Sequence, residues 1–331
     1  MLGLGNSAFE TASALASEAA YVHILGRSTG GLRLASNTHY VGDVRAVNLG
    51  ATDTFLLKSL DTIDVNFDLR NGSLSRNADG TISLRIPQGV APNFNYREPY
   101  DRVIRCLGWR FDASMFDADT APRMLGTEDQ RTGKFPQMSS GFESSTPNMF
   151  FAGTLSHALD FKRSAGGFIH GFRYNLRALS RLLAQRNANV PWPARDIGAD
   201  ADSVARAFND RVRSSSGLYQ MFGVLADMVT IEKGRPAQYM EELPIDYILG
   251  VGCVPGSRAV TFHFDYGHGG HDGHADNSVV TIAPGQAHRS QFLHAIFRYF
   301  VCAKEGSLEL KAEHHGLEDF LASWYVLTVD L

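Results

Sequence analysis

A glycine turn near the start of the chain constrains the fold more than any other feature. Gly3 and Gly5 are followed by an alanine-rich stretch, residues 6–16, and then by a short apolar run, residues 21–25. The order of turn, helix and strand is that of a βαβ unit. Only two residues come before the turn in the printed sequence. The pattern therefore predicts a doubly wound α/β fold of the Rossmann type, incomplete at its N-terminus and frayed around Gly3.

The residues of this turn are candidates for binding a nucleotide. The first glycine permits the tight turn, and Gly5 lets a backbone amide approach a pyrophosphate on the positive end of the helix that Asn6 and Ser7 open. Arg27 follows the strand, where sites that prefer NAD usually carry an acid for the ribose 2′-hydroxyl. An arginine there suits a 2′-phosphate, so the sequence predicts NADPH as the ligand. The alternative is a plain glycine turn with a solvated arginine.

Further strands are expected downstream of this unit. Residues 61–86 alternate around polar turns at 70–72 and 77–80, which predicts a β-meander. Two later apolar runs, residues 103–108 and 149–153, each end in glycine, and they predict two buried strands that stop at Gly108 and Gly153.

A long helix and a break follow. Residues 168–185 have helical periodicity, and we expect one buried face formed by Phe172, Leu176, Leu179 and Leu183. Pro191-Trp192-Pro193 interrupts the pattern, so we place the domain boundary there. Residues 1–190 then hold the NADPH-binding domain with the C-terminal portion of an FAD-binding domain. Residues 191–331 form a mixed, β-containing accessory domain, which we expect to be helical to about residue 229 and to end in a helix near residues 317–324.

A second cluster of candidate residues lies between the second apolar run and the long helix. Thr154 follows Gly153 at the end of a predicted strand, where doubly wound sheets bind ligands. Ser164, Gly166 and Gly167 then open the helix with unhindered amides. The dipole of such a helix can stabilise a reduced, negatively charged flavin ring.

Two histidines flank this glycine turn. His157 and His170 are candidates for proton transfer because the ordinary pKa of histidine lies near neutrality, but a structural role is the favoured interpretation for each. Asp160 and Arg163 lie between them, and we expect them to cap the helix rather than to pair with each other.

A glycine-rich stretch near the end of the chain interleaves histidines with aspartates. Imidazoles and carboxylates are usual metal ligands, but ordering ligands on such a loop costs entropy. A surface loop is therefore favoured, and no metal is predicted. The residues concerned are Asp265, His268, His271, Asp272, His274 and Asp276.

Composition excludes some classes of partner and segment. A net charge of −4 and a pI near 6.3 give no reason to expect nucleic acid or an anionic membrane as a partner. No apolar stretch is long enough to span a membrane, and the N-terminus lacks the pattern of a signal peptide. Cys106, Cys253 and Cys302 are distant in sequence, which predicts neither a Cys-x-x-Cys pair nor a disulfide framework.

Taken together, these motifs resemble those of a known family. Similarity is most specific in residues 153–174, and it extends to most of the chain through segments 3–27, 40–46, 56–61, 100–111 and 190–193, and loosely 319–321. These segments resemble a family of FAD-dependent oxidoreductases, the endoplasmic-reticulum flavoproteins associated with degradation, within the wider flavin monooxygenase and pyridine-nucleotide oxidoreductase superfamily.

The resemblance implies FAD and NADPH as cofactors, with hydride transfer from NADPH to FAD. It also implies a role in the endoplasmic-reticulum lumen, in the disposal of misfolded glycoproteins beside a J-domain protein with thioredoxin-like repeats. The family's N-terminal signal and FAD-binding glycine motif are not found in the sequence, so we expect a fragment that does not retain FAD alone. The alternatives are a flavin-dependent monooxygenase and a non-catalytic binding module on a nucleotide-binding scaffold.

Overall fold

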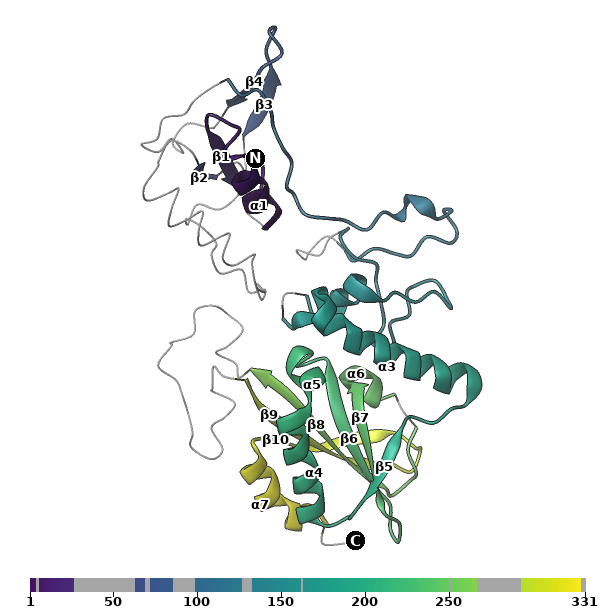
Figure 1. Cartoon of the computed structure of the whole chain (residues 1–331). Helices are drawn as coiled ribbons and strands as arrows, with labels where there is room; N and C mark the ends of the chain where they lie inside the picture. The colour runs from purple at the N-terminus through teal and green to yellow at the C-terminus, as the bar shows by residue number, and fades with distance from the viewer. Residues whose placement is uncertain are drawn as a thin grey trace. The chain divides into compact units, whose positions relative to one another are not determined.

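The computed structural model describes nine stretches of the chain, which Figure 1 draws as coloured ribbon: residues 1–3, 6–26, 63–68, 72–85, 99–126, 133–161, 163–250, 252–266 and 293–328. Two compact units divide after Arg110. The first unit contains parallel strands with a helix, and the second contains a six-stranded antiparallel sheet with helices. The predicted mixed α/β class is confirmed.

The first unit contains the predicted glycine turn, helix and strand. Helix α1 (Asn6–Leu15) precedes strand β1 (Val22–Gly26), which pairs in parallel with β2 (Ile63–Asp68). The helix forms because small residues recur on one face, and that face packs on β1 through Ala8, Phe9, Ala12, Val22 and Ile24.

The residues before the glycine turn take part in the same set of strands. Leu2 forms parallel bridges to both Leu25 and Arg105, so it lies between β1 and the segment around residue 105. Its amide donates to the Ile104 carbonyl at 2.8 Å, and its carbonyl accepts from the Cys106 amide at 2.7 Å. The expected fraying near Gly3 is therefore wrong, because hydrogen bonds hold this segment on both sides.

Gly3 is required by a close backbone approach. It has a φ of +130°, and a Cβ added there would lie 2.1 Å from the carbonyl oxygen of Cys106. Only glycine avoids both the steric clash and the backbone strain.

The predicted meander is confirmed in part. Strands β3 (Ser73–Arg76) and β4 (Ile82–Arg85) form an antiparallel hairpin around the expected turn, where the Asn77 amide donates to the Thr81 carbonyl at 2.8 Å. Strand β2 instead pairs with β1, so the three strands do not form one meander.

The two predicted buried strands that end in glycine are wrong. Residues 103–108 form a single bridge at Arg105, and the side chain of Leu107 is 62% exposed. Residues 149–153 likewise form one bridge, between Phe150 and Glu143. A strand needs a partner along its length, and within the described residues each run is paired over only one or two residues.

The second unit is built on one antiparallel sheet. The strand order is β10-β9-β8-β6-β7-β5. The strands are β5 (Ala194–Ile197), β6 (Leu225–Ile231), β7 (Ala237–Pro244), β8 (Arg258–Tyr266), β9 (Leu293–Cys302) and β10 (Leu308–His315). Its helices are α3 (Ile169–Ala188), α4 (Ala201–Ser214), α5 (Ser216–Gln220), α6 (Ile245–Ile248) and α7 (Leu317–Thr328), with short 3₁₀ helices η2 (Ala113–Met115), η3 (Gly153–Leu159) and η4 (Ala165–Gly167).

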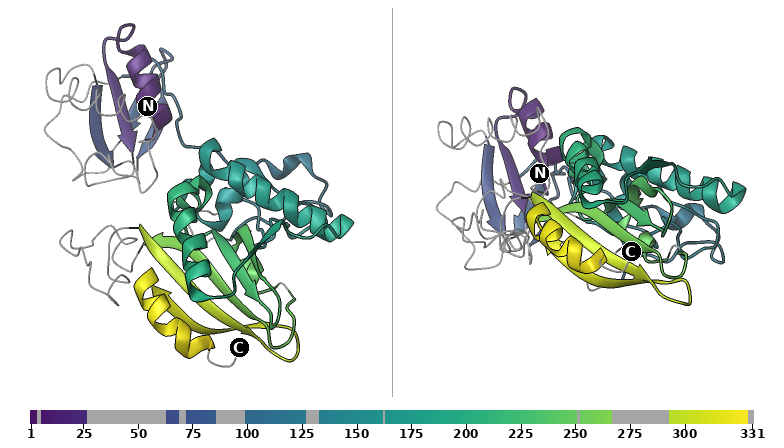
Figure 2. Two further views of the ribbon diagram at one scale, coloured as in Figure 1. Left: turned by 60° about the horizontal axis from the view of Figure 1, so that its bottom comes forward. Right: turned by 90° about the horizontal axis from the view of Figure 1, so that it is seen from below.

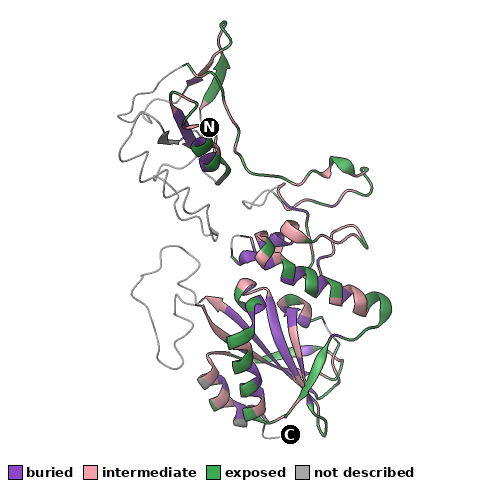
Figure 3. Ribbon diagram, viewed as in Figure 1, coloured by how far each residue is buried: buried purple, intermediate pink, exposed green. Residues whose placement is uncertain are grey.

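Helices α4 and α7 cover one face of this sheet (Figure 2). The Phe208 ring of α4 meets Phe262 and Phe297 at centroid distances of 5.1 and 5.3 Å, and Phe297 stacks on Phe320 of α7 at 4.7 Å. Strand β6 is buried along almost its whole length (Figure 3). The predicted final helix is confirmed as α7, but the helical stretch expected to reach residue 229 is wrong, because residues 225–231 are the central strand β6.

Helix α3 joins the core of this same unit. Its buried side chains include Tyr174, Ala178 and Leu182, which belong to the same hydrophobic cluster as Trp192 and the sheet. The compact units thus divide after Arg110, and the predicted boundary at residue 190 lies inside one core. Which stretch binds which cofactor stays a prediction.

The expected buried face of α3 is displaced around the helix. Leu176 is 39% exposed, whereas Gly171, Tyr174, Ala178 and Leu182 face the core. Leu179 is buried as expected. The apolar periodicity fits two overlapping faces, and packing against the sheet selects the one with smaller residues.

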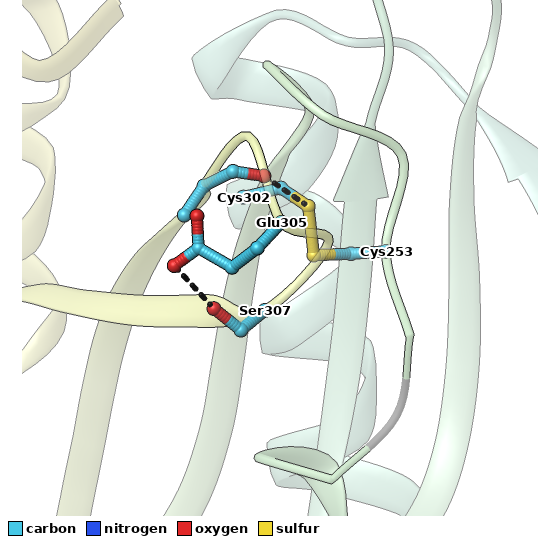
Figure 4. The surroundings of a disulfide bond; sticks show 5 residues. Cys253, Cys302, Glu305 and Ser307 are labelled. Carbon is cyan, nitrogen blue, oxygen red and sulfur yellow. Dashed lines mark hydrogen bonds between the residues drawn. A yellow bond between two sulfur atoms is a disulfide. The ribbon is translucent and has the colours of Figure 1, made fainter.

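A disulfide joins Cys253 to Cys302 (Figure 4). The expectation of no disulfide is therefore wrong. The two cysteines are 49 positions apart in sequence, and only the return of β9 along β8 brings them together. Among the helices that the structure describes, none is long and apolar enough to cross a membrane.

Candidate functional site

The candidate site of the second unit is the turn between residues 153 and 170. It consists of η3, η4 and the first turn of α3. Gly153 begins it with a φ of +66°, and the Ser156 hydroxyl donates to the Gly153 carbonyl at 2.8 Å. The side-chain amide of Asn175 on α3 donates in turn to Ser156 Oγ at 3.2 Å, and this hydrogen bond connects η3 to the helix. Thr154 is half-buried in this turn.

Asp160 is the centre of the hydrogen bonds in this turn. Its carboxylate accepts from the Ser164 amide at 3.1 Å and also from the Ser164 hydroxyl. Ser164 Oγ accepts from the Gly166 amide at 3.2 Å and so caps η4. Asp160 does not pair with Arg163, which instead contacts both carboxylate oxygens of Asp265 on β8 at 2.9 and 3.2 Å.

His157 lies beneath the glycine turn in an aromatic setting. It is 7% exposed, and its Nδ1 lies 3.3 Å from Asp160 Oδ1. The Phe135 and Phe161 rings meet the imidazole edge-on at centroid distances of 6.3 and 5.5 Å. This packing supports the structural interpretation of His157.

Gly166 and Gly167 make room for these buried side chains. A Cβ at Gly166 would lie 2.7 Å from Asp160 Oδ1, and one at Gly167 would lie 3.2 Å from the Cδ2 atom of His157. The sequence suggested these glycines as open amides for a ligand. In the structure their small size also lets the turn close over Asp160 and His157.

The start of α3 is the open part of the site. Its N-cap residue, Phe168, provides no side-chain cap. Within the described residues, the amides of Ile169 and His170 have no hydrogen-bond acceptor, and the Ile169 side chain is 74% exposed. His170 stacks on Phe168 at 5.5 Å. Free amides at the positive end of a helix of 20 residues favour an anionic group.

The other candidates lie in the first unit or outside the described residues. Gly3 is held as described above, α1 begins at Asn6, and the Ser7 carbonyl accepts from the Thr11 hydroxyl at 2.7 Å. Gly108 is exposed with a φ of +78°. Gly5 and Arg27 lie outside the described residues, so their predicted contacts are not tested.

The same holds for most of the histidine and aspartate stretch. Positions 267–292 lie outside the described residues, and Asp265, which is described, pairs with Arg163. In the part of the chain that the structure describes, no group of three or more histidine, cysteine, aspartate or glutamate side chains could hold a metal ion.

A buried ionic cluster in the sheet was not predicted. Asp227 on β6 is fully buried and lies 2.5 Å from Arg211 Nε of α4. The Tyr239 hydroxyl donates to Asp227 Oδ2 at 2.8 Å, and the Glu242 amide donates to Oδ1 at 2.9 Å. Burial raises the pKa of Tyr239, and its charged neighbour Asp227 raises that pKa further. A single acid inside the apolar run of residues 225–231 was the available signal, because such an acid needs a partner.

This cluster also ties α3 to the sheet. Glu242 has a φ of +59°, opposite the irregularity in the pairing of β6 with β7, and its carboxylate binds Arg177 of α3 and Arg211 of α4. Gly217 leaves room for this carboxylate, since a Cβ there would lie 2.4 Å from Glu242 Oε1. The ion pair of half-exposed Arg177 with buried Glu242 thus adds to the apolar packing that holds α3, which carries the candidate site, on the sheet.

Comparison with known proteins identifies two close relatives. A curated mouse (Mus musculus) protein is 38% identical over an alignment 368 positions long, and a zebrafish (Danio rerio) protein is 34% identical over one of 387 positions. Both alignments cover 98% of this chain. The chain is a homologue of FAD-dependent oxidoreductase domain-containing protein 2. The resemblance to FAD-dependent oxidoreductases that the motifs suggested is confirmed.

The match covers only part of each relative. The chain spans about half the length of these curated relatives, 53% of the mouse protein and 54% of the zebrafish protein. No family model matches the chain, and no solved structure matches it.

Proposed function

We propose that the protein is an FAD-dependent oxidoreductase. One observation carries this proposal: similarity over 98% of the chain to two curated proteins whose names state that activity. Because the relatives are about twice as long, the activity is proposed for the whole protein.

We propose that the flavin ring lies at the start of α3. The amides of Ile169 and His170 have no acceptor among the described residues, and no side chain caps the helix there. The positive end of the helix suits the negative charge of a reduced ring. When bound, FAD would accept a hydride from a nicotinamide and pass the electrons on.

The residues beneath the turn would position it. Asp160, Ser164 and Asn175 hold η3 and η4 through hydrogen bonds that are buried from solvent. Such rigid support keeps donors in place without reorganisation. We assign His157 to this support, because its ring is enclosed and its Nδ1 faces Asp160.

The finer parts of the proposal concern the reductant and the setting. We propose NADPH as the hydride donor, held at the glycine turn of Gly3 and by Arg27. We further propose the endoplasmic-reticulum lumen as the compartment, with a role in disposal of misfolded glycoproteins beside a J-domain protein with thioredoxin-like repeats. The Cys253–Cys302 bond supports an oxidising compartment, since stable disulfides are rare in the cytosol.

The test is anaerobic reduction of the intact, FAD-loaded protein. NADPH should bleach the absorbance of oxidised flavin, and NADH should do so less efficiently. NADPH binding without bleaching would instead favour a non-catalytic binding module. A flavin peroxide that persists in air would favour a monooxygenase.

A pair of variants tests the role of α3. Ile169→Glu places a negative charge at the exposed first turn, where it should lower the flavin's reduction potential without unfolding the helix. Leu176→Glu, on the exposed side of the same helix two turns later, is the matched control and should leave that potential unchanged. Equal potentials in both variants would place the flavin elsewhere.

A further inference from the structure

The disulfide fastens an irregular segment to the end of the sheet. Cys253 lies between α6 and β8, and Cys302 is the last residue of β9 (Figure 4). Cys302 is only 3% exposed and belongs to the main hydrophobic cluster, whereas Cys253 is half-buried at the edge of that cluster. One partner is thus fixed in the core and the other belongs to the segment.

Backbone hydrogen bonds align the same segment. The Cys253 amide donates to the Gly306 carbonyl at 3.1 Å, in the turn between β9 and β10. The Gly256 amide donates to the Cys302 carbonyl at 3.0 Å, and the Cys302 amide donates to the Ser257 carbonyl at 2.9 Å. Residues 252–257 therefore lie along the end of β9.

Side-chain packing contributes little to this attachment. Val254 within the segment and Leu249 just before it are each 54% exposed. Gly252 has no side chain, and nothing lies within 4 Å of where its Cβ would be. Cys253 is the residue of this segment that packs on the main hydrophobic cluster, so the disulfide and the three backbone hydrogen bonds make up the attachment.

We propose that the Cys253–Cys302 bond is a redox-controlled lock on residues 252–257. While the bond is closed, the segment is held along the β9–β10 turn, and reduction releases it while the sheet stays folded. The reductant is a dithiol: one thiolate attacks a sulfur of the disulfide and forms a mixed disulfide, and the second thiol displaces it. Two electrons and two protons pass from the dithiol, which is oxidised, to the cysteines, which become thiols.

The two thiols should differ in reactivity once the lock is open. Cys253 moves into solvent together with residues 252–257, whereas Cys302 stays buried in the core at the end of β9. Alkylation of Cys253 by iodoacetamide should therefore be roughly tenfold faster than alkylation of Cys302.

The experiment combines hydrogen exchange with peptide mapping of the intact protein, before and after treatment with dithiothreitol. Reduction should increase amide exchange most in residues 252–257 and 303–307, and the amides of β6 and α4 should remain the most protected. A Cys106→Ala variant, which alters the cysteine outside this bond, is the control and should behave as the wild type does. A Cys253→Ser variant should show the increased exchange without any reductant.

Three results would overturn the proposal. The first is unchanged exchange in residues 252–257 after complete reduction, and the second is loss of protection throughout the sheet. The third is opening of the bond by NADPH alone in the anaerobic holoprotein, which would make the pair an electron relay. In the NADPH experiment, flavin absorbance reports the proposed oxidoreductase activity, and peptide mapping reports the state of the disulfide. The oxidoreductase proposal and the disulfide proposal can therefore fail independently. If Cys253→Ser does not fold, the wild-type measurements alone still decide.

Discussion

At the scale of single residues, Gly171 shows how closely α3 lies against the turn before it. A Cβ at this position would lie 2.0 Å from the Ala165 carbonyl oxygen, and 2.8 Å from the Ala165 Cβ. The helix cannot move away, because its buried face is packed on the sheet. Gly171 therefore allows α3 to begin directly against η4 in the candidate site.

Replacing Gly171 by alanine should destabilise the second unit by about 1–3 kcal/mol, the usual cost of overpacking. The measurement is urea unfolding followed by circular dichroism. Gly252→Ala is the matched control, because nothing lies within 4 Å of its Cβ position, and it should change stability by less than about 0.5 kcal/mol. Equal stabilities for the two variants would mean that α3 can shift freely.

His263 on β8 should make stability depend on pH. Burial, with a smaller effect from the charge of Arg298, lowers the pKa of His263 to about 3. The unfolded chain binds this proton below about pH 6.5 and the folded chain does not until about pH 3, so stability falls as pH falls through that range. Between pH 7 and pH 5 the loss should be about 2 kcal/mol at most.

The His263→Phe variant should lose this part of the pH dependence. Unfolding in urea at pH 7 and pH 5 measures it, with His170→Gln as the control that keeps the dependence. An identical pH dependence in wild type and His263→Phe would show that another group is responsible.

Arg27 carries the prediction about the nicotinamide cofactor. A charge-assisted contact to a 2′-phosphate is worth about 1.5–3 kcal/mol, so Arg27→Ala should reduce the preference for NADPH over NADH by roughly tenfold to a hundredfold. Steady-state kinetics of the FAD-loaded intact protein with both nucleotides measures the ratio. A ratio that does not change would identify Arg27 as a solvated side chain.

At the scale of elements, the disulfide also bears on the stability of the sheet. It links cysteines 49 positions apart, and the chain-entropy model gives about 4 kcal/mol for closing a loop of this size. The double variant Cys253→Ala with Cys302→Ala should lose about 2–4 kcal/mol in urea unfolding. Wild type under dithiothreitol should show a similar loss, and a loss below about 0.5 kcal/mol would contradict this estimate.

Elements set by local patterns could be predicted from the sequence, and elements set by distant partners could not. Helix α1 and strand β1 follow from a glycine turn and a few apolar positions within 26 residues. Strand β6 was mistaken for helix because its burial on both faces removes the alternation that marks a strand.

The candidate site shows the same division. The turn of residues 153–170 was located from its glycines and its polar residues, but its internal hydrogen bonds were not. Asp160 and Arg163 were expected to cap the long helix, but no side chain caps α3; Asp160 instead accepts from Ser164, which caps η4. Two contacts depend on the fold of the whole second unit and could not be predicted. Gly166 lies against Asp160, and Arg163 pairs with Asp265 about a hundred positions away.

At the scale of the whole molecule, the length of the relatives leads to a prediction about flavin. Flavin affinity in doubly wound folds depends on a glycine turn that holds the ADP pyrophosphate, and we propose that the turn at Gly3 binds the nicotinamide nucleotide instead. The 331-residue chain should therefore purify with little FAD, while a form as long as the relatives should hold close to one FAD per chain. Flavin absorbance after gel filtration measures how much FAD is bound per chain in each form. One tightly bound FAD on the 331-residue chain would reassign the Gly3 turn to flavin.

The bridge at Leu2 has a consequence for the timing of folding during synthesis. Leu2 is paired on one side with Leu25 and on the other with residues 104–106, which follow it by more than a hundred positions. At about 5–20 residues per second, a ribosome needs roughly 5–20 seconds to add those later residues. Throughout that interval one side of Leu2 lacks the segment with which it forms a bridge, so the first unit cannot close as it emerges. Its exposed edge is then a place where a chaperone can bind or another nascent chain can pair.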